Sequence, residues 1–291
     1  MAPHQKARAR FFIDPSCIDE AAGLARCGEA RLSHQVRNVL RLKGGDKVQL
    51  LDGLGHLWQA ELVSAGRTSI EFSIEPQTQA TKVKPRPFRL LSCLPLIKAQ
   101  RFEWALEKLS ELGVSQILPF YSERCMVKLK SIEAGRANRW LSICKEASEQ
   151  CERLFLPEVL EPVSLTDLLA QHGQPSNLIP SSPAAHQAAS QAANQTANQK
   201  RLLKLILSER NSKAPDMVSA LYNPTSTAVV AQQTLDVLVL SGPEGGFSTN
   251  ELKSIAAHDF CQVSLGDLIL RSETACVLAA GLVSTLNICK D

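Results

Sequence analysis

The pattern of apolar and polar positions divides the chain into two parts. As far as residue 80, short runs of alternating residues, such as 57–63 and 69–74, are separated by glycine-containing turns. Alternation with a period of two is typical of half-buried strands, because successive side chains of a strand point to opposite faces. Short strands at this spacing predict a small β-barrel domain over residues 1–80.

One segment of this first part has a helical pattern instead. If residues 32–40 form a short helix, then Leu32, Val36 and the pair Val39-Leu40 lie on one side of it. The sequence therefore predicts a short helix with one apolar side.

A linker separates the two parts. Residues 81–87 hold two prolines and several cations, so they do not pair regularly in a sheet. From residue 88 onward, apolar runs of strand length alternate with helical patterns. The predicted strands are 88–94, 114–120, 202–207 and 236–240, and the predicted helices are 101–112 and 139–154. This alternation predicts an α/β domain over residues 88–291 with a mainly parallel sheet.

Residues 173–199 interrupt the second domain. They are rich in Ala, Gln, Asn and Ser and have few large apolar side chains. Such a composition cannot offset the entropy lost on ordering, so a flexible insertion is predicted. A solvated helix is the alternative, because Ala and Gln favour helix.

Charge and hydropathy exclude some classes of protein. The 291 residues include 32 Lys and Arg against 29 Asp and Glu, a formal charge of +3. This balance does not by itself indicate a nucleic-acid partner, so local clusters of cations must carry that argument. Apolar runs are too short for a transmembrane helix, and the basic first residues lack the apolar core of a secretion signal. We therefore expect no membrane association.

Metal and nucleophile chemistry have no motif in this sequence. The nine cysteines are scattered without a CxxC pair, which predicts free thiols in a reducing cytoplasm rather than a zinc site or a disulfide framework. The histidines lack the spacing of a metal site or a catalytic triad, and GxSxG, GxGxxG and P-loop motifs are absent. We expect a cytoplasmic protein without a bound metal.

A glycine-rich turn is the most informative segment. SGPEGGFS (241–248) follows the apolar run 237–240 and leads into a capping box at 248–251. Glycines at a strand-to-helix turn let backbone amides approach a ligand closely, and open α/β sheets bind ligands at such turns. The same spacing also fits a plain tight turn.

A second strand-to-helix junction carries charge. In VSLGDLILRSETA (263–275), a predicted strand ends near Leu265, a loop runs to Arg271, and a helix follows. Arg271 and Glu273 lie at this junction. The alternative is an ordinary charge pair at a helix end, worth under about 1 kcal/mol when exposed.

Cations cluster in two further segments. Lys6, Arg8 and Arg10 alternate beside Phe11 and Phe12, so an extended chain presents the three cations on one side. That arrangement suits phosphate contact with base stacking, although a disordered basic tail is the alternative. The other cluster, for which a solvated surface is the alternative, comprises Arg124, Lys128, Lys130, Arg136, Arg139, Lys145 and Arg153.

These segments resemble a known family. Four segments are similar to the RsmE-type 16S ribosomal RNA uracil-N3 methyltransferases of the SPOUT superfamily: SGPEGGFSTNEL (241–252), VSLGDLILRSETA (263–275), EWALEKLSELGVSQILPFYSERCMVKL (103–129) and KEASEQCERLFLPEV (145–159). In the first part of the chain, RFFID (10–14) and HQVRNVLRLKGGDKVQLLDG (34–53) also match. The resemblance covers nearly the whole chain except residues 173–199. It implies an α/β, SPOUT-type, trefoil-knotted methyltransferase domain with an N-terminal PUA-like, RNA-binding β-barrel domain. It also implies S-adenosyl-L-methionine as cofactor, 16S rRNA in the small ribosomal subunit as substrate, and a homodimer.

The resemblance implies roles for individual residues. The implied cofactor-binding residues are Leu207, Ser208, Gly242, Pro243, Glu244, Gly245, Gly246, Leu265, Gly266, Ile269, Leu270, Arg271 and Thr274. The expected catalytic residues are Arg271, Arg10 and Glu273, and the expected RNA-binding residues are Arg8, Arg10, Arg124, Lys128 and Arg153.

Some alternatives stay open within this resemblance. Glu273 or Glu244 could act as the general base, or Glu273 could only orient Arg271. Ribose 2′-O-methylation by the same fold and a non-catalytic RNA-binding protein are the rival functions.

Overall fold

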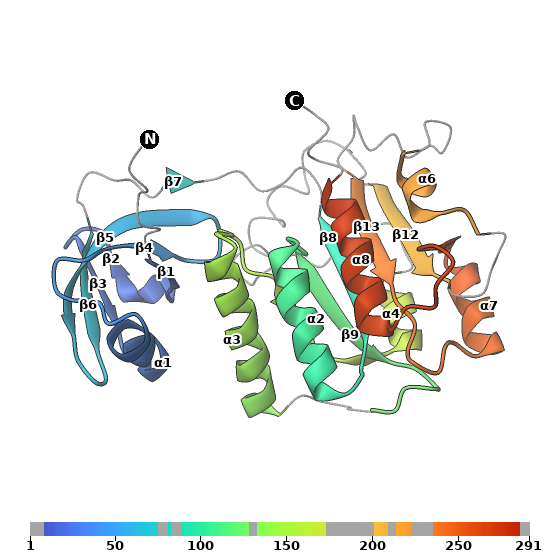
Figure 1. Ribbon diagram of the computed structural model, residues 1–291, viewed down its shortest axis with the longest axis horizontal. Coiled ribbons are helices and arrows are strands. Elements are labelled where there is room, and N and C mark those ends of the chain that lie inside the picture. The colour runs from blue at the N-terminus through green and yellow to red at the C-terminus, as the bar shows by residue number, and fades with distance from the viewer. Residues whose placement is uncertain are drawn as a thin grey trace. The chain divides into compact units, whose positions relative to one another are not determined.

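The computed structural model describes residues 9–74, 81–82, 89–127, 133–172, 201–208, 214–222 and 235–285. The chain forms two compact units (Figure 1). Unit 1 comprises residues 1–85 together with 145–156, and unit 2 comprises residues 86–144 together with 157–291. The predicted insertion at 173–199 lies outside the described residues.

Unit 1 is built on a curved seven-stranded sheet (Figure 1). Its order is β1-β4-β5-β6-β3-β2, with β7 paired to β5, and only the β1–β4 pair is parallel. The elements are β1 (Ala9–Phe12), η1 (Pro15–Cys17), β2 (Ile18–Asp19), β3 (Leu24–Cys27), α1 (Ala30–His34), η2 (Gln35–Val39), β4 (Lys47–Leu51), β5 (His56–Ala65), β6 (Ile70–Ile74) and β7 (Thr81–Lys82). The predicted alternation is present: every second residue of β6 is buried, and Phe11, Leu50 and Phe72 are fully enclosed in the core.

The predicted short helix is an α-helix, α1, that continues as a π-helix, η2. Leu32 and Val36 are buried as expected, but Val39 and Leu40 are 62% and 43% exposed, so the prediction of one apolar side was wrong. The reason is η2, which is a π-helix whose bonds join residues i and i+5. Each residue of such a turn rotates less about the axis than in an α-helix, so Val39 does not return to the side occupied by Val36, and Leu40 is the residue that ends the turn.

The boundary between the units falls within a helix, α3 (Ala134–Gln150). The Glu149 carboxylate accepts hydrogen bonds from the backbone N–H of Phe12 and from Nε2 of Gln35, both at 3.1 Å, and the N–H of Leu156 donates to the carbonyl of Gly53. Residues 145–156 thus pack with unit 1, whereas the sequence argument placed them in the domain 88–291. Residues 81–82 of the predicted linker form β7, and 83–87 lie outside the described residues.

Unit 2 contains a seven-stranded sheet in which all strand pairs are parallel. The order is β10-β9-β8-β13-β12-β14, with β11 paired to β9. The strands are β8 (Leu90–Pro95), β9 (Gln116–Tyr121), β10 (Glu158–Val159), β11 (Val163–Ser164), β12 (Arg201–Leu207), β13 (Leu235–Leu240) and β14 (Cys261–Val263). The remaining helices are α2 (Ala99–Glu111), α4 (Leu165–His172), α6 (Met217–Tyr222), α7 (Thr249–Ala257) and α8 (Ser272–Ser284).

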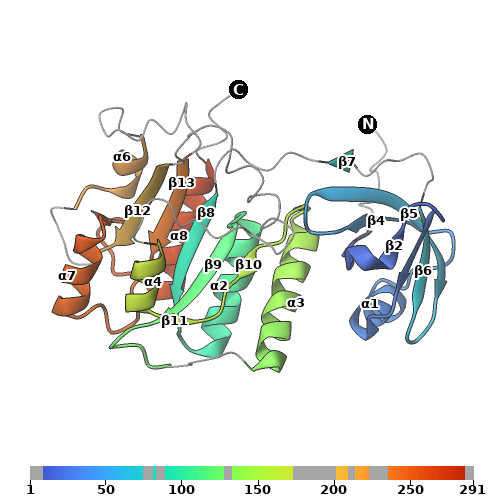
Figure 2. The same cartoon turned by 180° about the vertical axis from the view of Figure 1, so that it is seen from behind.

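Helices cover both faces of this sheet, as Figures 1 and 2 show from opposite sides. Along β13, Val237 and Val239 join the core under α2 and α8, whereas Leu238 and Leu240 join the core under α4 and α7. A strand buried on both faces has a continuous apolar sequence, which explains the run 237–240. Because β13 lies between β8 and β12 and all three are parallel, the loops that follow them meet at one edge of the sheet.

Candidate functional site

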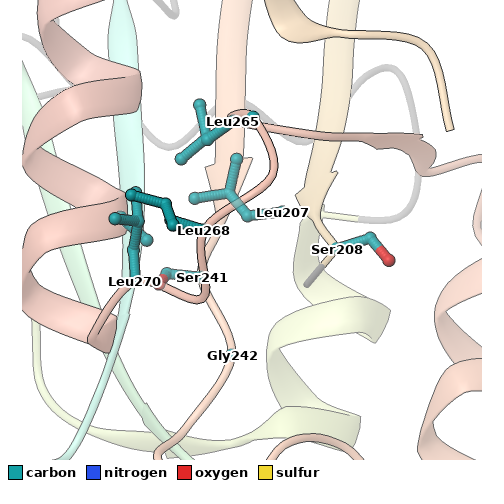
Figure 3. Close-up of a pocket in the computed structure, with 9 residues that line it drawn as sticks. Leu207, Ser208, Ser241, Gly242, Leu265, Leu268 and Leu270 are labelled. Atoms are coloured by element: carbon teal, nitrogen blue, oxygen red, sulfur yellow. The ribbon is translucent and has the colours of Figure 1, made fainter. Parts of the chain in front are cut away.

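A pocket lies at the carboxyl ends of β12, β13 and β14 (Figure 3). It encloses about 350 Å³ of space, part of it open to solvent. The lining residues come from three loops and the first turns of α8: Leu207, Ser208, Ser241, Gly242, Leu265, Gly266, Leu268, Leu270 and Ala275. Both glycine-bearing turns singled out in the sequence therefore line one pocket.

The pocket wall combines apolar side chains with exposed backbone. In Figure 3 the four leucine side chains gather on one side, and Ser208 lies on the other. Gly242 and Gly266 contribute only backbone. A wall of this kind suits a flat, largely apolar ring whose polar edge meets amides and carbonyls.

The loop between β13 and α7 is a tight turn in which Gly245 packs closely against Arg124. The N–H of Gly246 donates to the carbonyl of Pro243 at 2.8 Å. A Cβ placed on Gly245 would lie 3.0 Å from Cβ of Arg124 and 3.2 Å from its carbonyl oxygen. Only glycine allows this close approach without displacing the neighbouring segment.

The segment after β9 holds that turn in place. Nη1 of Arg124 donates to the carbonyl of Gly245 at 3.2 Å and lies 3.5 Å from the carbonyl of Phe247. The Glu251 carboxylate accepts the N–H of Glu123 and, in the capping box, the N–H of Ser248, both at 2.8 Å. The predicted capping box is thus confirmed, and its glutamate also anchors a second loop.

Two serines tie the loop after β13 to the start of α8. Ser241 Oγ donates to the carbonyl of Ser272 at 3.2 Å, and Ser272 Oγ donates to the carbonyl of Gly242. Both serines are buried. These bonds fix the two sides of the pocket relative to each other.

The loop after β14 is hydrogen-bonded at its base and exposed at its tip. Gly266 has φ +110°, which favours glycine, and Ser264 Oγ accepts its N–H at 3.2 Å. Beyond it, Leu268 is 80% exposed although it also lines the pocket. The base of this loop is therefore fixed, while its tip presents an apolar side chain outward.

A cluster of three charged side chains stands beside the pocket. Arg101, in the first turn of α2, pairs with Glu244 of the β13–α7 loop and lies with Nε 3.6 Å from Oε1 of Glu273 on α8. Glu273 is only 6% exposed, and its Oε2 is buried without a hydrogen-bond partner in the described part of the chain. A buried carboxylate oxygen of this kind is an acceptor available to a ligand's hydrogen.

Sequence reasoning missed Arg101. The signal was present, because Arg101 follows a buried strand and opens a helix at the ligand-binding edge of the sheet. Its pairing with Glu244 and Glu273 could not be read from the sequence. Ser241, Leu268 and Ala275 also line the pocket without having been predicted as cofactor contacts.

The predicted cofactor residues fall into two groups. Those lining the pocket are Leu207, Ser208, Gly242, Leu265, Gly266 and Leu270. Those in the same loops or the first turn of α8, outside its lining, are Pro243, Glu244, Gly245, Gly246, Ile269, Arg271 and Thr274. Their roles as cofactor contacts stay predictions.

The predicted catalytic arginines differ in their partners. Arg271 is the exposed N-cap residue of α8, and its side chain caps no backbone group. Arg10, in unit 1, pairs with Glu152 at 3.0 Å and donates to the Glu152 carbonyl at 3.1 Å. Part of the hydrogen-bonding capacity of Arg10 is therefore used within its own unit.

The predicted RNA-binding cations are only partly described. Arg124 is exposed but engaged with the turn at Gly245, and Arg153 is half-buried after α3. Arg8 and Lys128 lie outside the described residues. RNA binding by these four side chains and by Arg10 stays a prediction.

No cysteine is among the residues that line the pocket in the described part of the chain. All eight cysteines in the described ranges are free, as predicted. Burial, with Glu273 nearby, raises the pKa of Cys276 on α8 to about 12, so this thiol is protonated and inert. Across the described residues, His, Cys, Asp and Glu side chains nowhere gather in threes that could hold a metal ion, and no described helix is long and apolar enough to span a membrane.

Comparison with known proteins agrees with this geometry. Residues 84–284 match the family model described as RNA methyltransferase domain. The chain belongs to this RNA methyltransferase family. Residues 36–75 match a second model, RNA methyltransferase PUA domain, so unit 1 of this methyltransferase, with its curved sheet, is PUA-like.

The alignments with two named relatives cover most of this RNA methyltransferase. "Ribosomal RNA small subunit methyltransferase E" of Synechocystis is 29% identical over 95% of this chain and 77% of its own length. The protein of the same name from Bacillus subtilis is 27% identical over 94% of this chain and 95% of its own length. The resemblance to RsmE-type enzymes stated from sequence motifs is thus confirmed.

Solved structures share the fold. A Neisseria gonorrhoeae ribosomal RNA small subunit methyltransferase E, bound to S-adenosyl methionine, aligns with a TM-score of 0.70 at 24% identity, over 96% of this chain and 98% of its own. A Legionella pneumophila methyltransferase, also solved with this cofactor, aligns with a TM-score of 0.71 at 25% identity, over 97% and 98%. The predicted α/β methyltransferase domain with a PUA-like N-terminal domain is confirmed. The trefoil knot stays a prediction.

Proposed function

We propose that this RNA methyltransferase transfers a methyl group from S-adenosyl-L-methionine to N3 of a uridine in 16S rRNA of the small ribosomal subunit. The observation that carries the proposal is the meeting of the 242 and 266 loops at one pocket, in a chain that belongs to this family. The names of the relatives and the cofactor bound to the Neisseria and Legionella proteins support it. A homodimer, as the resemblance implies, and a cytoplasmic location, as the scattered cysteines predict, are part of the same proposal.

The pocket residues fit the proposed cofactor. The leucines after β12 and β14 offer apolar contact to adenine, and the backbone groups at Gly242 and Gly266 can bond its polar edge and the amino-acid tail. Oε2 of Glu273, two residues before Ala275 of the pocket lining, is a buried acceptor that would suit a ligand carrying hydrogen-bond donors. When bound, S-adenosyl-L-methionine supplies an electrophilic methyl group on a sulfonium.

Glu273 is the proposed proton acceptor. Uracil N3 carries an imide proton that must leave for the nitrogen lone pair to attack a methyl group. Oε2 of Glu273 is held by the protein without a hydrogen-bond partner among the described residues, so it can take this proton. Arg101, beside Oε1, orients the carboxylate and is a positioning residue.

Cations stabilise the charge that develops on the base. As the N3–H bond weakens, negative charge grows on O2 and O4 of the uracil. The Arg271 side chain, exposed at the N-terminus of α8, is the proposed cation for these oxygens, and Arg10 is proposed as a second catalytic cation. Because N3 lies on the Watson–Crick edge, the target uridine must be unpaired or flipped. Arg8, Arg124, Lys128 and Arg153 are the proposed phosphate contacts that position it.

Labelled methyl transfer tests the proposal. Small subunits from cells lacking the modification are incubated with the protein and labelled S-adenosyl-L-methionine, with large subunits as control. Nucleoside analysis should find 3-methyluridine in the small-subunit RNA alone. Recovery of a 2′-O-methylated nucleoside instead would assign the rival reaction, and absence of cofactor binding in calorimetry would leave a non-catalytic RNA-binding protein.

A further inference from the structure

Two cysteines of unit 1 come together although they belong to different elements. Cys17 is the last residue of η1, and Cys27 is the last residue of β3. η1 packs against β3, and the core of unit 1 includes Cys27, with Cys17 packed against it. Burial raises the pKa of the Cys27 thiol to about 12, and the charge of Cys17 and a side-chain hydrogen bond with it add to this effect. The two thiols therefore interact directly.

The local fold holds Cys17 in this position. β2 and β3 are antiparallel, with Ile18 opposite Ala25, so the chain before Ile18 lies beside the chain after Ala25. The Asp14 carboxylate accepts the N–H of Ser16 at 2.8 Å and its hydroxyl at 2.6 Å, and the N–H of Cys17 donates to the carbonyl of Asp14 at 2.9 Å. Cys17 is thus fixed on a capped helical turn rather than on a free loop.

The two thiols differ in their access to solvent. Cys27 is only 2% exposed, whereas Cys17 is half-buried. A small oxidant in solution can therefore reach the sulfur of Cys17, while Cys27 is shielded by the core and faces Cys17. Both thiols are free in this structure. This is the arrangement of a peroxide-accessible thiol beside a resolving thiol.

We propose that Cys17 and Cys27 form a reversible disulfide when the protein meets an oxidant of the hydroperoxide class. With hydrogen peroxide, the deprotonated sulfur of Cys17 attacks one oxygen and the O–O bond breaks. Cys17 becomes a sulfenic acid, and the leaving hydroxide takes up the proton that Cys17 lost, which gives water. The sulfur of Cys27 then attacks the sulfur of Cys17, the S–O bond breaks, and the hydroxide leaves with the Cys27 proton as a second water.

The step is balanced and needs little movement. Two thiols lose two electrons and two protons, and one hydrogen peroxide is reduced to two waters. Thiols that already interact through their side chains can reach the S–S bond length of about 2.05 Å by a small rotation. A low-molecular-weight thiol reverses the bond by exchange.

The disulfide would close the segment 17–27, which contains β2 and β3. A covalent link of this kind stabilises the folded state mainly by restricting the unfolded chain. It also consumes the sulfenic acid of Cys17 before further, irreversible oxidation. Disulfides in a reducing compartment are usually transient and redox-sensing, so thiols that are free at rest agree with this role. The inference does not depend on the proposed function, because it involves neither a methyl donor nor RNA.

Peptide mapping of the full chain tests the bond. The reduced protein is treated with hydrogen peroxide without denaturant, its remaining thiols are alkylated, and it is digested with trypsin. Cleavage after Arg10, Arg26 and Arg31 places Cys17 in peptide 11–26 and Cys27 in peptide 27–31. Mass spectrometry should find these two peptides joined after peroxide treatment and separate after dithiothreitol. The oxidised protein should melt about 5 °C or more above the reduced protein, and dithiothreitol should reverse the shift.

Single variants assign the two roles. In Cys27→Ser, the sulfenic acid of Cys17 has lost its resolving thiol and should be trapped by dimedone. In Cys17→Ser, peroxide should leave Cys27 reduced, because burial shields it. Cys261→Ser is the matched control: it removes an exposed cysteine of β14 in unit 2 and should keep both the joined peptides and the melting shift.

Three results would overturn the proposal. The first is wild-type protein in which peroxide oxidises Cys17 to sulfinic acid while Cys27 is still alkylated. The second is a bond from either cysteine to a different thiol, in the same chain or in a second copy. The third is joining of the two peptides only when the protein is denatured, or together with a lower melting temperature, since the native fold would then not support the bond.

Discussion

The arginines beside the pocket and those at positions 37 and 41 of unit 1 differ in their partners. Arg101 and Arg124 are engaged by carboxylates and carbonyls of their own unit, and they join loops that are far apart in the sequence. Arg37 and Arg41 have no ion-pair partner in the described part of the chain and lie beside exposed apolar side chains. Internal pairing thus makes Arg101 and Arg124 part of the structure that holds the pocket loops, whereas the charges of Arg37 and Arg41 are not compensated by any described carboxylate.

The two carboxylates of the charged cluster beside the pocket also differ in their partners. Glu244 and Glu273 share Arg101, but Glu244 lies on an exposed loop and Glu273 is buried with one oxygen unpartnered among the described residues. Only Glu273 has both a fixed orientation and a carboxylate oxygen that is available as an acceptor. The comparison therefore assigns the proton-accepting role to Glu273, and single variants can separate the two.

Glu273→Gln should have the largest effect. It keeps the shape of the side chain but removes the proton acceptor, so kcat should fall by about 10²–10⁴-fold. Single-turnover methyl transfer measures this, and calorimetry should find S-adenosyl-L-methionine affinity nearly unchanged. Glu244→Gln is the matched control, with a much smaller decrease in rate. Equal decreases in both variants would remove Glu273 from the catalytic role.

Arg101→Met should have the next largest effect. It leaves both carboxylates without their shared cation and lets Glu273 turn, which should lower kcat by about 10²-fold through poorer orientation. Arg101→Lys should recover part of the rate, because a lysine can still pair with Glu244 and Glu273. The double variant Arg101→Met/Glu273→Gln should be little slower than Glu273→Gln alone, since residues that act as a unit are not additive. Additive effects in this cycle would show that Arg101 acts independently.

Gly245→Ala tests whether the close contact with Arg124 shapes the pocket. The new Cβ would meet Arg124 at 3.0 Å and displace the turn, at a cost of about 1–3 kcal/mol. S-adenosyl-L-methionine affinity should fall by about tenfold or more in calorimetry. Gly281→Ala is the control, because a Cβ there meets nothing within 4 Å and the position is helical. An unchanged affinity in Gly245→Ala would mean that the turn can shift without harm to the pocket.

Local features of the fold and site were predictable from the sequence. The run 237–240, the glycines after it and the capping box at Ser248 act within a few residues of one another, so the pattern located both the strand end and the ligand loop. Parallel pairing then brings the loops after β12, β13 and β14 together. These are consequences of periodicity and of the general topology of α/β sheets.

Long-range and unusual local features were not predictable. The Arg101–Glu244 pair joins residues 143 positions apart, and residues 145–156 join unit 1 through Glu149 and Leu156. A periodic pattern carries no information on such pairings. Val39 and Leu40 were misplaced because an apolar pattern of helical spacing does not distinguish an α-helix from a π-helix.

The smallest predicted effect is a change in the pH dependence of stability, and it arises from Glu149, a buried carboxylate of unit 1. Burial raises the pKa of Glu149, although hydrogen bonds from Gln35 and Phe12 and the charge of Arg31 oppose this. A raised pKa means that the folded state binds the proton more tightly than the unfolded chain, so the free energy of unfolding falls as pH rises above the ordinary glutamate value of 4.5 through the raised pKa. Glu149→Gln removes this term.

Thermal unfolding between about pH 4 and about pH 8 checks the sign. The melting temperature of Glu149→Gln relative to wild type should become more favourable as pH rises, whatever its value at the acidic end, where removal of one acceptor also counts. Glu146→Gln is the control, because it removes a carboxylate charge beside the same Arg31 from an exposed position. A relative melting temperature that falls with rising pH would show that Arg31 and the two hydrogen bonds outweigh burial. The charged form of Glu149 would then stabilise the packing of residues 145–156 in unit 1, rather than reduce the stability of the folded state.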